Sequence, residues 1–126
     1  MARILVIDDD DLPRRAVVRM LEAGGHDVRD AGDGTSGLRL WHETGADLVV
    51  TDLAMPDLTG FEVIGILHAE APTLPILAIS GSLMVTDQEL VRRTGRLGAQ
   101  LLGKPFSREQ LMAAVASALG TGSGPT

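Results

Sequence analysis

With 126 residues, of which 44% are hydrophobic and 2% aromatic, the chain is long enough for one domain with an aliphatic core and too short for two. The net charge of -6 argues against direct binding of nucleic acid, and the absence of cysteine excludes disulfides and thiol chemistry. No signal peptide precedes the first apolar run, and no apolar run approaches the roughly 18 residues of a membrane span, so we expect a cytoplasmic protein that does not bind membranes.

Short apolar runs, typical of strands, alternate along the chain with helical patterns. In chain order we expect a strand over 3–7, a helix over about 12–24, a weaker strand over 26–30, a helix over 34–44, a strand over 47–51, a helix over about 59–69, a strand over 75–79, a helix over about 84–96, a strand over 99–102 and a helix over 107–119. This alternation predicts an α/β fold, a doubly wound five-stranded parallel sheet flanked by five helices. We expect one domain over 1–120 and a flexible tail or linker stub over 121–126.

Local signals mark several helix ends. Pro13 suits the first turn of a helix, and Asp33 suits an N-cap. Ser107 and Gln110 have the spacing of a capping box, which predicts the start of the last helix. Gly95 lies inside the fourth predicted helix and disfavours it, so we expect that helix to be marginal.

Polar side chains follow four of the five predicted strands. They are Asp8 and Asp9 after the first strand, Asp52 after the third, Ser80 after the fourth and Lys104 after the fifth. Because ligands of an open parallel sheet bind beyond the carboxyl ends of its strands, we expect these residues to form one cluster. Lys104 is the single lysine among 11 basic residues, and a compact ammonium on a flexible stem suits contact with an anionic ligand.

Five segments carry a resemblance to a known family. They are ILVIDDD at 4–10, DLVVTDLAMP at 47–56 with Gly60, ISG at 79–81, GA at 98–99 and KPF at 104–106. In this order they resemble the receiver domain of two-component response regulators, over nearly the whole chain from residue 3 to about 119. The resemblance implies a flavodoxin-like fold with strand order 2-1-3-4-5, like that of stand-alone chemotaxis receivers.

The resemblance also implies roles for the acidic residues. Asp52 is expected to be the phosphoacceptor, since a carboxylate can attack phosphorus and form an acyl phosphate. Asp8 and Asp9 are expected to bind Mg²⁺ (or Mn²⁺), together with Asp52 and the backbone carbonyl of Ala54. Crowded carboxylates repel one another and an incoming phosphate, so we expect phosphoryl transfer to depend on the divalent ion.

Two further residues have implied roles beside the phosphoacceptor. Lys104 is expected to pair with Asp52 and then with a phosphoryl oxygen, where it would stabilise the transferring group. The resemblance implies a cis peptide bond between Lys104 and Pro105. Ser80 is expected to be the switch hydroxyl, which would donate to a phosphoryl oxygen and draw the following loop inward.

The implied function is that of a response regulator receiver in a two-component phosphorelay. A histidine kinase or a histidine phosphotransfer domain would donate a phosphoryl group to Asp52, and the change of conformation would act on an unknown output protein. Such a domain is not a separate enzyme, because it catalyses only its own phosphorylation and dephosphorylation. Family members usually dock the phosphodonor on the first helix, here Leu12 and Pro13, beside the loop at 105–106. We expect a monomer or a weak dimer.

One position departs from the family pattern. The usual aromatic switch residue, three positions before the lysine, is Leu101, and the segment from Gly98 to Lys104 is one residue shorter than usual. We therefore expect the loop after Ser80 and the fourth helix to give the readout, in place of a rotating Tyr or Phe. The departure leaves open an alternative, a receiver-like interaction module that works without phosphorylation. An aspartyl phosphatase is disfavoured, because it would usually carry a second acid where this chain has Ala54.

Overall fold

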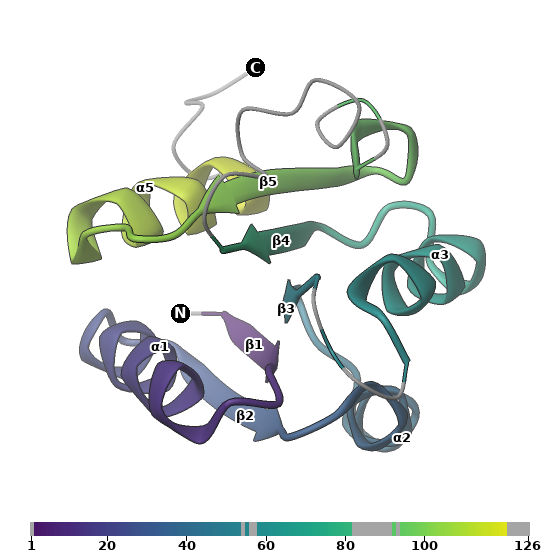
Figure 1. Ribbon diagram of the computed structural model, residues 1–126, viewed down its shortest axis with the longest axis horizontal. Helices are drawn as coiled ribbons and strands as arrows, with labels where there is room; N and C mark the ends of the chain where they lie inside the picture. Colours follow the sequence, from purple (N-terminus) through teal and green to yellow (C-terminus); the bar gives the residue numbers. More distant parts are fainter. Residues whose placement is uncertain (1, 54, 56–57, 82–91, 93, 121–126) are drawn as a thin grey trace.

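Figure 1 shows the protein as a computed structural model, which describes residues 2–53, 55, 58–81, 92 and 94–120. Five parallel strands form one sheet in the order β2-β1-β3-β4-β5, as the resemblance implied. The strands are β1 (Arg3–Ile7), β2 (Asp27–Ala31), β3 (Leu48–Asp52), β4 (Ile76–Ser80) and β5 (Ala99–Gly103). The predicted strands are therefore confirmed to within one residue at each end.

Helices cover both faces of this sheet. Within the described part of the chain they are α1 (Asp11–Ala23), α2 (Gly34–Thr44), α3 (Gly60–Glu70) and α5 (Arg108–Leu119). Figure 1 shows α1 and α5 on one side of the strands and α2 and α3 on the other. The helix predicted over 84–96 falls mostly outside the described residues. Its described residues, 92 and 94–96, are helical. None of the helices described here has the length and apolar character needed to cross a bilayer.

The strands contribute to two separate cores, because successive residues of a strand point to opposite faces of the sheet. Ile4 and Val6 pack on the side of α1 and α5, whereas Leu5 and Ile7 pack on the side of α2 and α3. β3 and β4 are buried along their whole length. Such strands are typical of a parallel sheet covered on both faces, and their packing holds the strand ends in place.

Side-chain caps begin α2 and α5 at the predicted places. The Asp33 carboxylate accepts a hydrogen bond from the backbone N–H of Ser36 at 2.7 Å. Ser107 and Gln110 form the reciprocal capping box at the start of α5, with distances of 3.0 and 2.8 Å. An N-cap of this kind stabilises a helix by about 1 kcal/mol, so the local sequence determines where these helices begin.

Candidate functional site

The carboxyl edge of the sheet brings together residues that are far apart in the sequence. Asp8 and Asp9 follow β1, Asp52 and Ser80 are the last residues of β3 and β4, and Lys104 follows β5. Neighbouring parallel strands end at the same level, since Ile7 pairs in register with Thr51 and Asp52 pairs with Ile79. The sheet order therefore explains why these side chains meet.

Three carboxylates form a compact cluster at this edge. Asp8, Asp9 and Asp52 each offer one oxygen, and these atoms all lie within 4.8 Å of one another. Asp8 is only 4% exposed and Asp52 only 9% exposed. A set of hard oxygen donors at this spacing fits a divalent cation such as Mg²⁺. The fourth expected ligand, the backbone carbonyl of Ala54, lies outside the described residues.

The electrostatics of Asp8 reflect this crowding. The pKa of the Asp8 carboxyl is raised from 3.8 to about 6, chiefly by burial and to a smaller extent by the charge of Asp52 and a hydrogen bond with it. The backbone N–H of Asp10, which donates to Asp8 Oδ1 at 3.0 Å, and the ammonium of Lys104 act in the opposite direction. The pKa is therefore raised mainly because burial disfavours the charged form of the carboxyl, with the negative charge of Asp52 as a smaller cause.

Lys104 lies against two of these carboxylates. Its Nζ is 3.6 Å from Asp52 Oδ2 and 3.8 Å from Asp8 Oδ2, which are ion-pair distances too long for hydrogen bonds. The backbone N–H of Lys104 donates to the carbonyl of Ser80 at 2.8 Å, so the end of β4 positions the start of the lysine loop. The peptide bond between Lys104 and Pro105 is cis, which confirms the expectation from the sequence.

Ser80 and Leu101 lie on the last two strands. Ser80 ends β4 and is 4% exposed, in register with Gly103 of β5. Leu101 pairs with Ala78 and is partly buried against the core on the side of α2 and α3. Most of the loop after Ser80 and of the helix expected over 84–96 lies outside the described residues, so the expectation that they give the readout stays a prediction.

The start of α3 packs directly on the strand that ends with Asp52. The backbone N–H of Gly60 donates to the carbonyl of Leu53 at 3.1 Å. A Cβ atom at Gly60 would overlap the backbone of Asp52 and Leu53. Glycine is therefore required at this position by close backbone approach.

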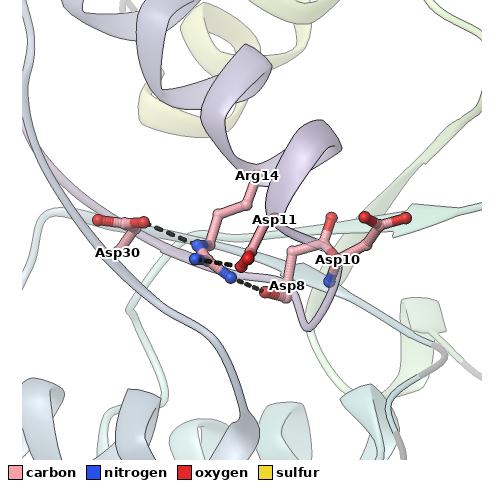
Figure 2. A network of polar contacts seen from close by, with 5 residues as sticks. All are labelled: Asp8, Asp10, Asp11, Arg14 and Asp30. Atoms are coloured by element: carbon pink, nitrogen blue, oxygen red, sulfur yellow. Dashed lines mark hydrogen bonds and ion pairs between the residues drawn. The ribbon is translucent and has the colours of Figure 1, made fainter.

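An arginine that the sequence analysis did not single out lies behind the acidic loop. Figure 2 shows the guanidinium of Arg14, from α1, between Asp8, Asp11 and Asp30. Its Nη1 donates to the Asp8 backbone carbonyl at 2.8 Å, its Nη2 to Asp11 Oδ1 at 2.7 Å and its Nε to Asp30 Oδ2 at 2.8 Å. The spacing of Asp11 and Arg14 could have predicted a helical ion pair, but the other two contacts depend on tertiary structure.

An apolar groove opens beside the cluster. It has a volume of about 580 Å³ and lies between α1 and the loop that follows β5. Its lining residues include Pro13, Ala16, Met20, Pro105 and Phe106. The groove reaches Lys104, so a partner bound there would lie next to the carboxylates.

Comparisons with known proteins agree with this geometry. Residues 4–116 match the family model of the response regulator receiver domain. Protein PilH of Pseudomonas aeruginosa is 32% identical over 121 residues, which cover 94% of this chain and 98% of PilH. The response regulator MprA of Mycobacterium sp. strain KMS is 37% identical over 111 residues, which cover 88% of this chain and 47% of MprA. The chain thus spans about half the length of several curated relatives that it matches, including 46% of the probable transcriptional regulatory protein TcrX of Mycobacterium tuberculosis.

Solved structures show the same fold. The receiver domain of NtrX from Brucella abortus superposes with a TM-score of 0.86 at 30% identity, over 94% of this chain and 98% of that domain. The chemotaxis protein CheY4 of Vibrio cholerae has a TM-score of 0.86 at 29% identity and the same coverage of 94% and 98%. Since the family model covers most of the sequence, the chain belongs to the receiver domains of response regulators.

Proposed function

We propose that the protein accepts a phosphoryl group on Asp52 from a histidine kinase or a histidine phosphotransfer domain. The observation that carries this proposal is the position of the Asp52 carboxylate, which clusters with Asp8 and Asp9 and lies 3.6 Å from the ammonium of Lys104. A nucleophile, a candidate cation site and a mobile positive charge thus converge on one point. Phosphoryl transfer requires mainly such positioning and charge stabilisation.

The proposed reaction is a displacement at phosphorus. An oxygen of the Asp52 carboxylate forms a bond to phosphorus while the P–N bond of a phosphohistidine breaks, and the imidazole nitrogen leaves with the electron pair. Lys104 moves from its ion pair with Asp52 to a phosphoryl oxygen, and the Ser80 hydroxyl donates to another. The acceptor is part of the chain, so the domain catalyses its own phosphorylation and dephosphorylation and turns over no separate substrate.

The acidic cluster is proposed to hold Mg²⁺ (or Mn²⁺). When bound by Asp8, Asp9, Asp52 and the backbone carbonyl of Ala54, the ion would neutralise negative charge on the phosphoryl oxygens. The spacing of the carboxylates supports this assignment, because one oxygen each of Asp8, Asp9 and Asp52 lies within 4.8 Å of the other two. Without the ion, the negative charges of the three carboxylates would repel an incoming phosphate group.

The groove between α1 and the loop after β5 is the proposed docking surface for the phosphodonor. It is apolar and adjoins Lys104, and Leu12, which precedes the lining residue Pro13 in the sequence, is 76% exposed. A transient contact between signalling partners suits a small surface of this kind. Four expectations from the sequence stay predictions. They are an unknown output partner, a cytoplasmic location, a monomeric or weakly dimeric state, and the domain limits of 1–120 and 121–126.

The test is the intact mass of the protein after incubation with acetyl phosphate and Mg²⁺. We expect a gain of about 80 Da, for one phosphoryl group, that is lost in Asp52→Asn and in EDTA. Beryllofluoride, a stable phosphoryl mimic, serves as the control for rapid hydrolysis. If the folded protein neither gained mass nor bound beryllofluoride, the proposal would fail and the phosphorylation-independent interaction module would take its place.

A further inference from the structure

The guanidinium of Arg14 is bound on three sides. It joins the loop after β1, the first turn of α1 and the end of β2, through Asp8, Asp11 and Asp30 (Figure 2). All three donor–acceptor distances lie between 2.7 and 2.8 Å, and the Arg14 side chain is only 14% exposed. A partly buried arginine with three short contacts to oxygen acceptors is held in one orientation, because its planar guanidinium matches the three acceptors together.

The backbone at Gly32 lies close to the guanidinium. Gly32 follows β2, and a Cβ atom at that position would lie 3.2 Å from Arg14 Nη1. A side chain at Gly32 would therefore require the guanidinium to shift by a few tenths of an ångström. The Asp11 and Asp30 side chains are 69% and 41% exposed, so these two ion pairs contribute little stability by themselves. The contact with the Asp8 carbonyl is the least exposed of the three.

The residue that Arg14 contacts through its backbone, Asp8, is the most buried of the three clustered carboxylates. The backbone N–H of Asp8 donates to the carbonyl of Ala31 at 3.1 Å, its carbonyl accepts from Arg14, and its side chain accepts from the N–H of Asp10. Arg14 supplies the contact on the side where the chain turns away from β1 toward Asp9. That turn must be held firmly, because the carboxylates of the cluster repel one another.

We propose that Arg14 is a positioning residue for the metal site, which holds the backbone of Asp8 so that the Asp8 and Asp9 carboxylates converge with that of Asp52. This inference rests on the proposed function, since it assumes that the cluster binds Mg²⁺. Residues behind a metal site that orient its ligands commonly change metal affinity 10- to 100-fold when they are replaced. Arg14 acts through the loop and does not itself contact the ion.

The proposal predicts a change in Mg²⁺ affinity opposite in direction to the change that charge alone would cause. Removing a cation near the cluster should, by charge alone, strengthen the binding of Mg²⁺. Loss of a positioning contact should weaken it. Arg14→Met keeps most of the aliphatic stem and removes the guanidinium, and Arg15→Met removes the same charge from an exposed position of α1 as a matched control.

The experiment is a titration of ¹⁵N-labelled protein with MgCl₂, followed by amide chemical shifts. We expect the Mg²⁺ dissociation constant to rise at least about tenfold in Arg14→Met and to stay the same or fall slightly in Arg15→Met. Dispersed amide signals in β4 and α5 report in the same spectra that the fold is intact. Equal or tighter binding by Arg14→Met would overturn the proposal.

Two further measurements separate positioning from a general loss of stability. In metal-free Arg14→Met, amide exchange should accelerate at 8–11 and stay unchanged in β4, whereas uniform acceleration would contradict the proposal. Arg14→Lys restores the positive charge but replaces the planar guanidinium with a compact ammonium, so it should recover little of the Mg²⁺ affinity. Full recovery would show that the guanidinium geometry is not required. If the wild-type protein bound Mg²⁺ but accepted no phosphoryl group, the proposed function would fail while the comparison of variants still decided the role of Arg14.

Discussion

Lys104 faces two carboxylates at once, at 3.6 Å from Asp52 and 3.8 Å from Asp8. Its ammonium therefore interacts with the same carboxylates that a metal ion would bind. In Lys104→Met we expect Mg²⁺ to bind several-fold more tightly and the pKa of Asp8 to rise further above 6, because a neighbouring positive charge is gone. Phosphorylation by acetyl phosphate should nevertheless slow about 100-fold, because a group that stabilises the transferring phosphoryl is lost.

The same amide titration and a time course of intact mass measure the two effects of Lys104→Met. Arg14→Met serves as the comparison, since both changes remove one positive charge near the cluster. Opposite signs for their Mg²⁺ affinities are expected. Weaker Mg²⁺ binding in Lys104→Met would show that the lysine orders the carboxylates instead of competing with the ion.

At the scale of an element, α3 offers a matched pair of glycines. A methyl group at Gly60 would overlap the backbone of Asp52 and Leu53, whereas a methyl group at Gly65 would meet nothing within 4 Å. We expect Gly60→Ala to lower the free energy of unfolding by about 1–3 kcal/mol, because the start of α3 must move away from β3. Gly65→Ala should raise it by about 0.5–1 kcal/mol, since alanine favours a helix.

Urea denaturation of both alanine variants measures these changes, and acetyl phosphate reports on the site. Gly60→Ala should also slow phosphorylation, because the displaced backbone is that of the acceptor, while Gly65→Ala should react like the wild type. Full stability and normal phosphorylation of Gly60→Ala would mean that β3 and α3 separate at little cost.

At the scale of the whole molecule, the acidic cluster makes stability depend on pH. The pKa of Asp8 is about 6 in the folded protein, against 3.8 for an ordinary aspartate, so the folded state binds this proton more tightly than the unfolded state. The resulting stabilisation is fully present below pH 3.8 and is lost as the pH rises through 6. In EDTA we expect Asp8→Asn to gain about 1 kcal/mol relative to the wild type between pH 5 and pH 7, since the amide resembles the protonated acid.

Urea denaturation of wild type and Asp8→Asn in EDTA, at pH 5, 6 and 7, measures this difference. Comparing the two proteins cancels the contributions of the other carboxylates. Added Mg²⁺ should reduce the pH dependence of the wild type, because it compensates the ionised cluster. A constant difference between the two proteins across this range would contradict a titrating Asp8.

Much of this architecture follows from local signals. Apolar runs predicted the strands, and Asp33 and Ser107 predicted helix starts, because a cap depends on residues three positions apart. The convergence of Asp8, Asp52 and Lys104 could be predicted because parallel strands end at one edge of a sheet. The role of Arg14 could not, since its contact with the Asp8 carbonyl depends on how α1 folds back on the loop after β1, and its contact with Asp30 depends on how α1 packs beside β2.

The order of the strands divides the site between two parts of the sheet. The acids come from β1 and β3, which pair with each other, whereas Ser80 and Lys104 come from β4 and β5 at the other side. During folding, a sheet that had assembled only through β3 would already hold the carboxylates, and β5 would add the ammonium last. The ability to bind the metal would then arise before the ability to accept a phosphoryl group. Phosphoryl acceptance would therefore report that the last strand, β5, has joined the sheet.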